Sequence, residues 1–256
     1  MISIDKLSYI SKLRYVNPME KFLFSMITMF CGIFLNNILV SIIIFCIMSF
    51  MTLYKAKIPF VSYYKLILIP LVFLIIGIIT VAINVGYNKE FLFSFKILGL
   101  IMGCTIEGLY SAMQILFKSI ASVSCLYFLA LTTPIVEVLS VLKKLKVPKL
   151  FIELMGLIYR LIFVLFETMN TIYVSQTGRL GYSTIKKGYR SLGQLVTTLF
   201  IRAYKKSQDM YTAMEARCYN GEINVIEKQY KTSYKNIGMI IFLQIVLVII
   251  KYKIHI

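Results

Sequence analysis

The stretch MEKFLFSMITMFCGIFLNNILVSIIIFCIMSFMTLY, residues 19–54, decides the fold. It is apolar almost throughout, and its apolar core is broken only by Asn36-Asn37. A single helix of this length, at 1.5 Å per residue, would be far longer than the roughly 30 Å hydrocarbon core of a bilayer. We therefore interpret the stretch as two membrane-spanning helices, about 19–36 and 38–54, that turn at the asparagine pair.

Three further apolar runs, about 62–85, 107–132 and 237–250, bring the expected number of membrane-spanning helices to five. The segment 91–104 is interpreted as either a re-entrant or an interfacial stretch. Lys118 falls near the middle of the fourth helix. A charge in that place is either functional or is satisfied within the helix bundle, and the sequence leaves both open.

The distribution of charge predicts how the chain lies in the membrane. The net charge is +17, and the segment 134–233 holds more than half of the 28 lysines and arginines. Because Lys and Arg gather on the cytoplasmic side, we expect a multi-pass protein of the plasma membrane whose N-terminus and 134–233 segment are cytoplasmic. The basic residues flank apolar runs instead of lining one groove, which argues against nucleic acid as a partner.

Within the basic segment, the spacing of apolar residues indicates an amphipathic helix over 135–145 and two long helices, about 149–177 and 189–217. A sixth membrane span over 150–166 is the rival interpretation. It is disfavoured because Arg160 would lie in the bilayer and because the basic residues that follow would lie outside.

The expected fold class is therefore an all-α membrane protein with about five transmembrane helices and a cytoplasmic helical region. Its expected parts are transmembrane helices one to four in 1–133, the cytoplasmic region in 134–233 and a last transmembrane helix in 234–256.

The sequence shows no catalytic or metal-binding constellation. His255 is the only histidine, the five cysteines are scattered, and no GxxxxGK[ST] loop is present to bind ATP phosphates. We expect a chain that is not an enzyme, holds no cofactor or metal and does not hydrolyse ATP by itself. A membrane-embedded lipid-modifying enzyme, the alternative from another class, would need polar catalytic residues gathered at one depth, and none are found.

Two short stretches close the two long helices of the basic segment. They are SQTGRLGY, residues 175–182, and AMEARCYNG, residues 213–221. Each places an arginine at the C-terminal end of a helix with small residues beside it. Such an arginine either only caps the helix through its dipole, or docks into a partner through bidentate pairs with carboxylates.

The chain resembles the transmembrane (T) components of energy-coupling-factor (ECF) importers, most closely the cobalt/nickel-type CbiQ family. The resemblance spans about residues 10–250. It is carried by Leu131-Thr132-Thr133-Pro134, Leu145-Lys146-Val147-Pro148, Tyr159-Arg160, Leu199-Phe200-Ile201-Arg202 and Ala213-Met214-Glu215-Ala216-Arg217. The family has two Ala-Arg-Gly signatures, each on a coupling helix. Similarity maps them onto Gly178-Arg179-Leu180 and Ala216-Arg217-Cys218, so the first keeps only the arginine and the second has Cys for Gly.

The resemblance implies a function and a set of partners. Two ATP-binding-cassette ATPase subunits, which hold ATP and magnesium, bind the six signature residues, and their closure moves the cytoplasmic coupling region. A separate substrate-binding membrane subunit receives that motion, so this chain would couple ATP hydrolysis to uptake of cobalt or nickel. A T component of a vitamin-type ECF importer is the alternative.

Overall fold

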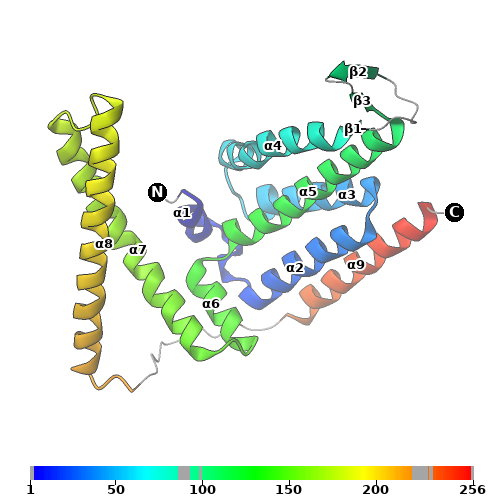
Figure 1. Ribbon diagram of the computed structural model, residues 1–256. Coiled ribbons are helices and arrows are strands. Elements are labelled where there is room, and N and C mark those ends of the chain that lie inside the picture. Colours follow the sequence, from blue (N-terminus) through cyan, green and yellow to red (C-terminus); the bar gives the residue numbers. More distant parts are fainter. Residues whose placement is uncertain (1–2, 86–92, 98–99, 221–229, 231–232, 255–256) are drawn as a thin grey trace. The chain divides into compact units, whose positions relative to one another are not determined.

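The computed structural model divides into two compact units (Figure 1). The residues that it describes are 3–85, 93–97, 100–220, 230 and 233–254. The first unit comprises Met1–Val141 and Gln229–Ile256, and the second comprises Leu142–Lys228. The second unit is thus an insertion in the chain of the first, and each is described below by itself.

The first unit contains the membrane-spanning helices. Five helical stretches in the described part of the chain are long and apolar enough to cross a bilayer, which confirms the five predicted spans. They are α2 (Pro18–Leu35), α3 (Ile38–Phe50) with a π-helical continuation (Met51–Lys55), α4 (Phe60–Ala82), α5 (Ile106–Thr132) and α9 (Tyr234–Ile254).

The asparagine pair ends one helix and begins the next. Asn36 takes the left-handed conformation, with φ 47°, at the end of α2, where asparagine is tolerated. The side chain of Asn37 accepts a hydrogen bond from the amide of Leu39 at 2.9 Å and so caps α3. The predicted turn is confirmed at these two residues.

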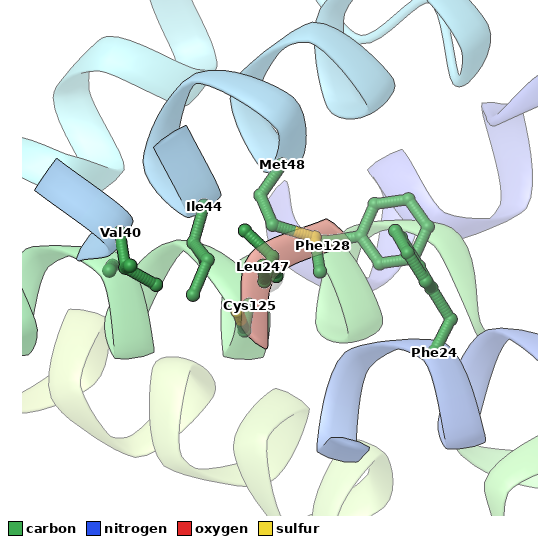
Figure 2. Close-up of a cluster of buried hydrophobic side chains, with 8 residues drawn as sticks. Phe24, Val40, Ile44, Met48, Cys125, Phe128 and Leu247 are labelled. Carbon is green, nitrogen blue, oxygen red and sulfur yellow. The ribbon is translucent and has the colours of Figure 1, made fainter. Parts of the chain in front are cut away.

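A cluster of buried apolar side chains holds α2, α3, α5 and α9 together (Figure 2). Its aromatic rings, Phe24 and Phe128, meet edge to face with their centroids 5.5 Å apart. Helix α5 also packs against α4 and is therefore central to the bundle. The cluster consists of Phe24, Val40, Ile44, Met48, Ala121, Cys125, Phe128 and Leu247.

Three short strands between α4 and α5 form an antiparallel sheet in the order β1-β3-β2. They are β1 (Ile83–Val85), β2 (Phe93–Ile97) and β3 (Leu100–Cys104). The described part of the segment 91–104 is therefore two paired strands, while residues 91–92 and 98–99 lie outside the described part. The third span ends at Ala82 instead of 85, because its last predicted residues belong to β1.

The first unit also contains α1 (Ser3–Ile10), a 3-10 turn (Lys12–Tyr15) and the part of α6 (Ile135–Lys144) up to Val141, where the second unit begins. Helix α6 begins after Pro134, whose carbonyl accepts the amides of Glu137 and Val138 at 2.9 and 3.1 Å.

The second unit is a pair of long helices, α7 (Lys149–Gly178) and α8 (Ile185–Glu215). Helix α8 begins four residues before the predicted position, because the Thr184 side chain caps it through the amide of Lys187. Helix α7 is not among the helices apolar enough to cross a membrane, which is against the sixth span over 150–166. That residues 134 and 233 bound a cytoplasmic region stays a prediction.

Candidate partner-binding site

The first predicted docking element lies where α7 ends. The amide of Gly181 donates to the carbonyl of Gln176 at 2.9 Å, and the amide of Leu180 donates to that of Thr177 at 3.0 Å. This pair of bonds is the Schellman motif, which ends a helix through one residue in the left-handed conformation. Here that residue is Leu180, with φ 57°. Arg179 directly precedes it.

Helix α8 ends in the same way. The amide of Tyr219 donates to the carbonyl of Met214 at 3.0 Å, and the amide of Cys218 donates to that of Glu215 at 2.9 Å. Cys218 takes the left-handed conformation, with φ 59°, and Arg217 directly precedes it. The two ends of the helical pair are therefore built on one pattern.

The six predicted site residues occupy equivalent places in the two motifs. Gly178 corresponds to Ala216, Arg179 to Arg217 and Leu180 to Cys218. The third place needs a positive φ, which glycine adopts without steric cost. The structure thus gives a backbone reason for a signature that ends in glycine. In this chain the third place is held by Leu180 and Cys218, which take the left-handed conformation although neither is a glycine.

Both arginines are exposed. Leu180, 69% exposed, and Cys218 lie beside them at the surface. In the described ranges of the chain neither guanidinium has an ion-pair partner. Each is therefore free to form a bidentate pair with a carboxylate of another molecule.

The length of α8 separates the two arginines. Arg179 precedes this helix in the chain and Arg217 follows it. A helix of 31 residues is roughly 46 Å long at 1.5 Å per residue. One compact surface cannot contact both ends, so two separate surfaces are needed to engage both.

Polar contacts fix the turn between α7 and α8. The Tyr182 hydroxyl donates to the Gln176 side chain at 2.7 Å, and the Ser191 hydroxyl donates to the carbonyl of Gly181 at 2.9 Å. A Cβ atom on Gly181 would meet both the Gln176 carbonyl oxygen and the Ser191 hydroxyl at 2.8 Å. Gly181, which lies outside the signature, is therefore the glycine that this turn requires.

A tyrosine joins α7 to the chain that follows α8. The Tyr219 hydroxyl donates to the carboxylate of Glu153 at 3.0 Å, and this hydrogen bond raises the pKa of Tyr219. The end of α8 at residue 217 is therefore held to α7 near its start, at Glu153.

A second polar site lies in the transmembrane unit, and sequence reasoning missed it. Lys21, only 4% exposed in the first turn of α2, donates to the carbonyl of Thr132 at 2.9 Å. Its Nζ lies 3.6 Å from the carboxylate of Glu137 in α6. The Tyr230 hydroxyl donates to the same carboxylate at 2.8 Å. Burial, with this hydrogen bond, raises the pKa of Tyr230 to about 12, so the hydroxyl stays a donor at neutral pH.

The neighbouring residue, Glu20, is 5% exposed and bonds the start of α9. Its carboxylate accepts hydrogen bonds from the amide of Ser233 and the side chain of Asn236, both at 2.7 Å. The only sequence signal for this site was a pair of opposite charges, Glu20-Lys21, in the first turn of an apolar helix.

Lys118, the metal-ligating residue types and His255 are the remaining candidates that the sequence analysis considered. Lys118 in α5 donates an exposed hydrogen bond to the Asn36 side chain at 3.2 Å, so the protein itself supplies a partner for this charge. The described residues contain no group of three His, Cys, Asp or Glu side chains that could hold a metal ion. His255 lies outside the described residues.

Comparisons with known proteins place the chain in a family. A family model described as "Cobalt transport protein" (CbiQ) matches residues 10–230. An uncharacterized protein of Methanocaldococcus jannaschii is 34% identical over 97% of this chain and 92% of its own length. The cobalt transport protein CbiQ of Salmonella typhimurium is 28% identical over 88% of this chain and all of its own. The energy-coupling factor transporter transmembrane protein EcfT of Exiguobacterium sibiricum is 30% identical over 82% of this chain and 83% of its own.

The family match covers most of the chain, residues 10–230. The resemblance seen in the sequence is thereby confirmed, and with it a transporter membrane subunit instead of an enzyme. The chain belongs to the CbiQ family, the T components of ECF transporters.

Proposed function

We propose that this chain is the coupling subunit of an ATP-driven ECF-type importer. It passes the motion of two ATP-binding-cassette ATPase subunits to a separate substrate-binding membrane subunit. The imported substrate is cobalt or nickel. ATP and magnesium are held by the ATPase subunits, and this chain holds no cofactor.

The duplicated helix end carries the proposal. Arg179 and Arg217 stand at the same place in two equal Schellman motifs, and both are exposed. They lie at opposite ends of α8, roughly 46 Å apart along the helix. Two equal docking elements at this separation suit two similar partner subunits, each of which receives one helix end.

The chemistry of these ends favours an acidic partner groove. The left-handed residue turns the chain away from the helix axis, so the preceding arginine lies exposed at the end of the helix. Guanidinium groups form bidentate pairs with carboxylates, and such pairs grow stronger where water is excluded. At the first end the exposed Leu180 adds an apolar contact beside the charge.

The proposal requires both helix ends to face the cytoplasm, where ATP is present. The basic residues of α8 support this orientation, because lysine and arginine accumulate in cytoplasmic loops. In the same orientation the N-terminus is cytoplasmic and the Asn36-Asn37 turn is external.

Cobalt is preferred as the substrate because of the family to which the chain belongs, whose description is "Cobalt transport protein". A vitamin-type importer is the second candidate, favoured by relatives that are named EcfT. Uptake of radioactive cobalt, compared with uptake of labelled vitamins by the same cells, separates the two.

The test changes one arginine at a time in the full complex. Removing one member of a buried charged pair costs about 2–5 kcal/mol, so Arg179→Ala and Arg217→Ala should weaken binding of the ATPase subunits at least about 30-fold. Lysine at either position should restore binding only partly, because it lacks the planar fork. Arg202→Ala, an exposed arginine within α8, is the matched control.

Co-purification of the ATPase subunits and uptake of cobalt are the two measurements. Normal binding and uptake by both alanine variants would show that these arginines only cap their helices, and the proposal would then fail.

A further inference from the structure

We infer that Glu20 and Lys21 form a clamp through which movement of the inserted unit reaches the transmembrane helices. The inference rests on the proposed function, because it assigns these residues a part in coupling. It begins with the connectivity of the chain. The unit Leu142–Lys228 joins the transmembrane unit at its two chain crossings, after Val141 and before Gln229.

Lys21 holds the first crossing. Carbonyl groups in the last turn of a helix have no partner within the helix. The carbonyl of Thr132, at the end of α5, instead accepts the Lys21 ammonium at 2.9 Å. The same ammonium lies 3.6 Å from Glu137 in the first turn of α6. Lys21 therefore fixes α5 and α6 to each other and to α2, at the point where the chain leaves for the inserted unit.

Glu20 holds the second crossing. Ser233 directly precedes α9, and its amide donates to the Glu20 carboxylate at 2.7 Å. Asn236, in the first turn of α9, donates to the other carboxylate oxygen at 2.7 Å. A carboxylate at a helix N-terminus is favoured by the helix dipole. The start of α9 is therefore fixed to the same turn of α2 that holds the first crossing.

Tyr230 connects the two halves of the clamp. Its hydroxyl donates to Glu137 at 2.8 Å, so a residue of the returning chain bonds a residue of the departing chain. Glu20 and Lys21 are 5% and 4% exposed, so loss of any partner would leave a charge buried without full compensation. The residues joined by these bonds therefore move together, because separating them would leave a buried charge without its partner.

The clamp also reaches the core of the bundle. Phe24, one turn further along α2, packs edge to face on Phe128 of α5. A displacement of either crossing must therefore move α2 and α5 together. Glu20 and Lys21 are positioning residues in this account. They touch neither ATP nor the transported ion.

The test uses the full chain in complex with its ATPase and substrate-binding subunits in proteoliposomes. The quantity measured is radioactive cobalt taken up per ATP hydrolysed. Lys21→Met and Asn236→Leu should lower this ratio about tenfold, a typical size for the loss of coupling between sites. Lys21→Arg keeps the charge and the donor and should restore most of the ratio.

Matched controls remove hydrogen bonds between the same helices away from the crossings. Ser25→Ala removes a bond from α2 to the carbonyl of Cys125 in α5, and Gln244→Leu removes a bond from α9 to Thr28 in α2. Both should keep the ratio of the parent. A merely structural role of the clamp would lower the amount of assembled complex and leave the ratio per complex unchanged.

Tyr230→Phe is the deciding variant if Lys21→Met does not assemble, because it removes a single hydroxyl. A parental ratio in intact complexes of the clamp variants would overturn the inference and leave the proposed function standing. Absence of cobalt uptake and of ATP hydrolysis in the parent complex would instead refute the proposed function, and the clamp with it.

Discussion

The two left-handed residues at the helix ends give a prediction whose size can be worked out. Leu180 and Cys218 have φ 57° and 59°. A residue with a side chain pays about 1–2 kcal/mol for this conformation, and glycine escapes that cost. Glycine loses about 0.5–1 kcal/mol more conformational entropy on folding. Leu180→Gly and Cys218→Gly should therefore each stabilise their helix end, by about 0.5–1 kcal/mol.

Hydrogen exchange of single amides measures this directly. The amide of Gly181 bonds Gln176, and the amide of Tyr219 bonds Met214, so each reports whether its motif is closed. At 1.4 kcal/mol per factor of ten, the expected gain is about a 2–5-fold slower exchange of Gly181 in Leu180→Gly and of Tyr219 in Cys218→Gly. We also expect Cys218→Gly to bind the ATPase subunits as well as the parent, whereas Leu180→Gly loses the apolar contact of the Leu180 side chain.

Lys146 provides a matched control for the backbone effect. It has φ 60° at the end of α6, where the amide of Val147 donates to the carbonyl of Leu142 at 3.2 Å. Lys146→Gly should slow exchange at Val147 by a similar factor without any change in partner binding. Unchanged or faster exchange at Gly181 and Tyr219 in the glycine variants would refute the reasoning that these residues are strained.

Four further predictions follow from the structure. In a variant without native cysteines, cysteines at 146 and 186 should be labelled only from the cytoplasmic side and those at 36 or 37 only from outside; external labelling of 186 would overturn the orientation. The purified chain alone should bind cobalt no better than a control membrane protein of similar charge, and His255→Ala should leave transport unchanged; calorimetry that shows a stoichiometric, high-affinity site would contradict this. The Tyr219 hydrogen bond should stabilise the helical pair below the ordinary tyrosine pKa of about 10 and be lost as the pH rises through the raised pKa. Tyr219→Phe should therefore reduce the loss of stability at alkaline pH measured by circular dichroism, while the raised pKa values of Tyr211 and Tyr230 leave part of that loss in place; an unaltered profile would exclude this role. Lys118→Met should cost at most about 1.5 kcal/mol in a thermal melt, because among the described residues the Lys118 ammonium donates one hydrogen bond, to the Asn36 side chain. Loss of transport with normal assembly would instead show that the charge is functional.

The features that the sequence predicted are those with local signals. The Asn36-Asn37 turn interrupts an apolar run that is too long for one span, and the structure ends α2 and begins α3 at these two residues. The long helices of the second unit follow from the repeat of apolar residues along them. These signals lie within a few turns of chain, so no knowledge of packing was needed.

The clamp could not be predicted in the same way. Lys21 bonds a residue 111 positions away, and Glu20 bonds one 216 positions away. Nothing in the first turn of α2 indicates which distant groups will meet it. In the sequence these polar residues only begin the first predicted span, 19–36.

The strands β2 and β3 show a different limit. Short apolar runs fit a strand or a buried helix equally well by periodicity, and only the pairing Phe93↔Cys104 to Ile97↔Leu100 decides between them. The helix ends are a third case. The sequence placed an arginine at each end, but the signature at 178–180 keeps only that arginine, so the left-handed conformation shared by Leu180 and Cys218 became visible only in the backbone angles.

The bond between Tyr230 and Glu137 also bears on how such chains can evolve. It brings the chain leaving for the insertion and the chain returning from it to within reach of one side chain. Insertions whose two ends lie close together are those that proteins tolerate and exchange. Recombination near codons 141 and 229 would therefore transfer the helical pair as a cassette. Under the proposed function, such an exchange would replace the two ATPase-binding helix ends and leave the transmembrane spans unaltered.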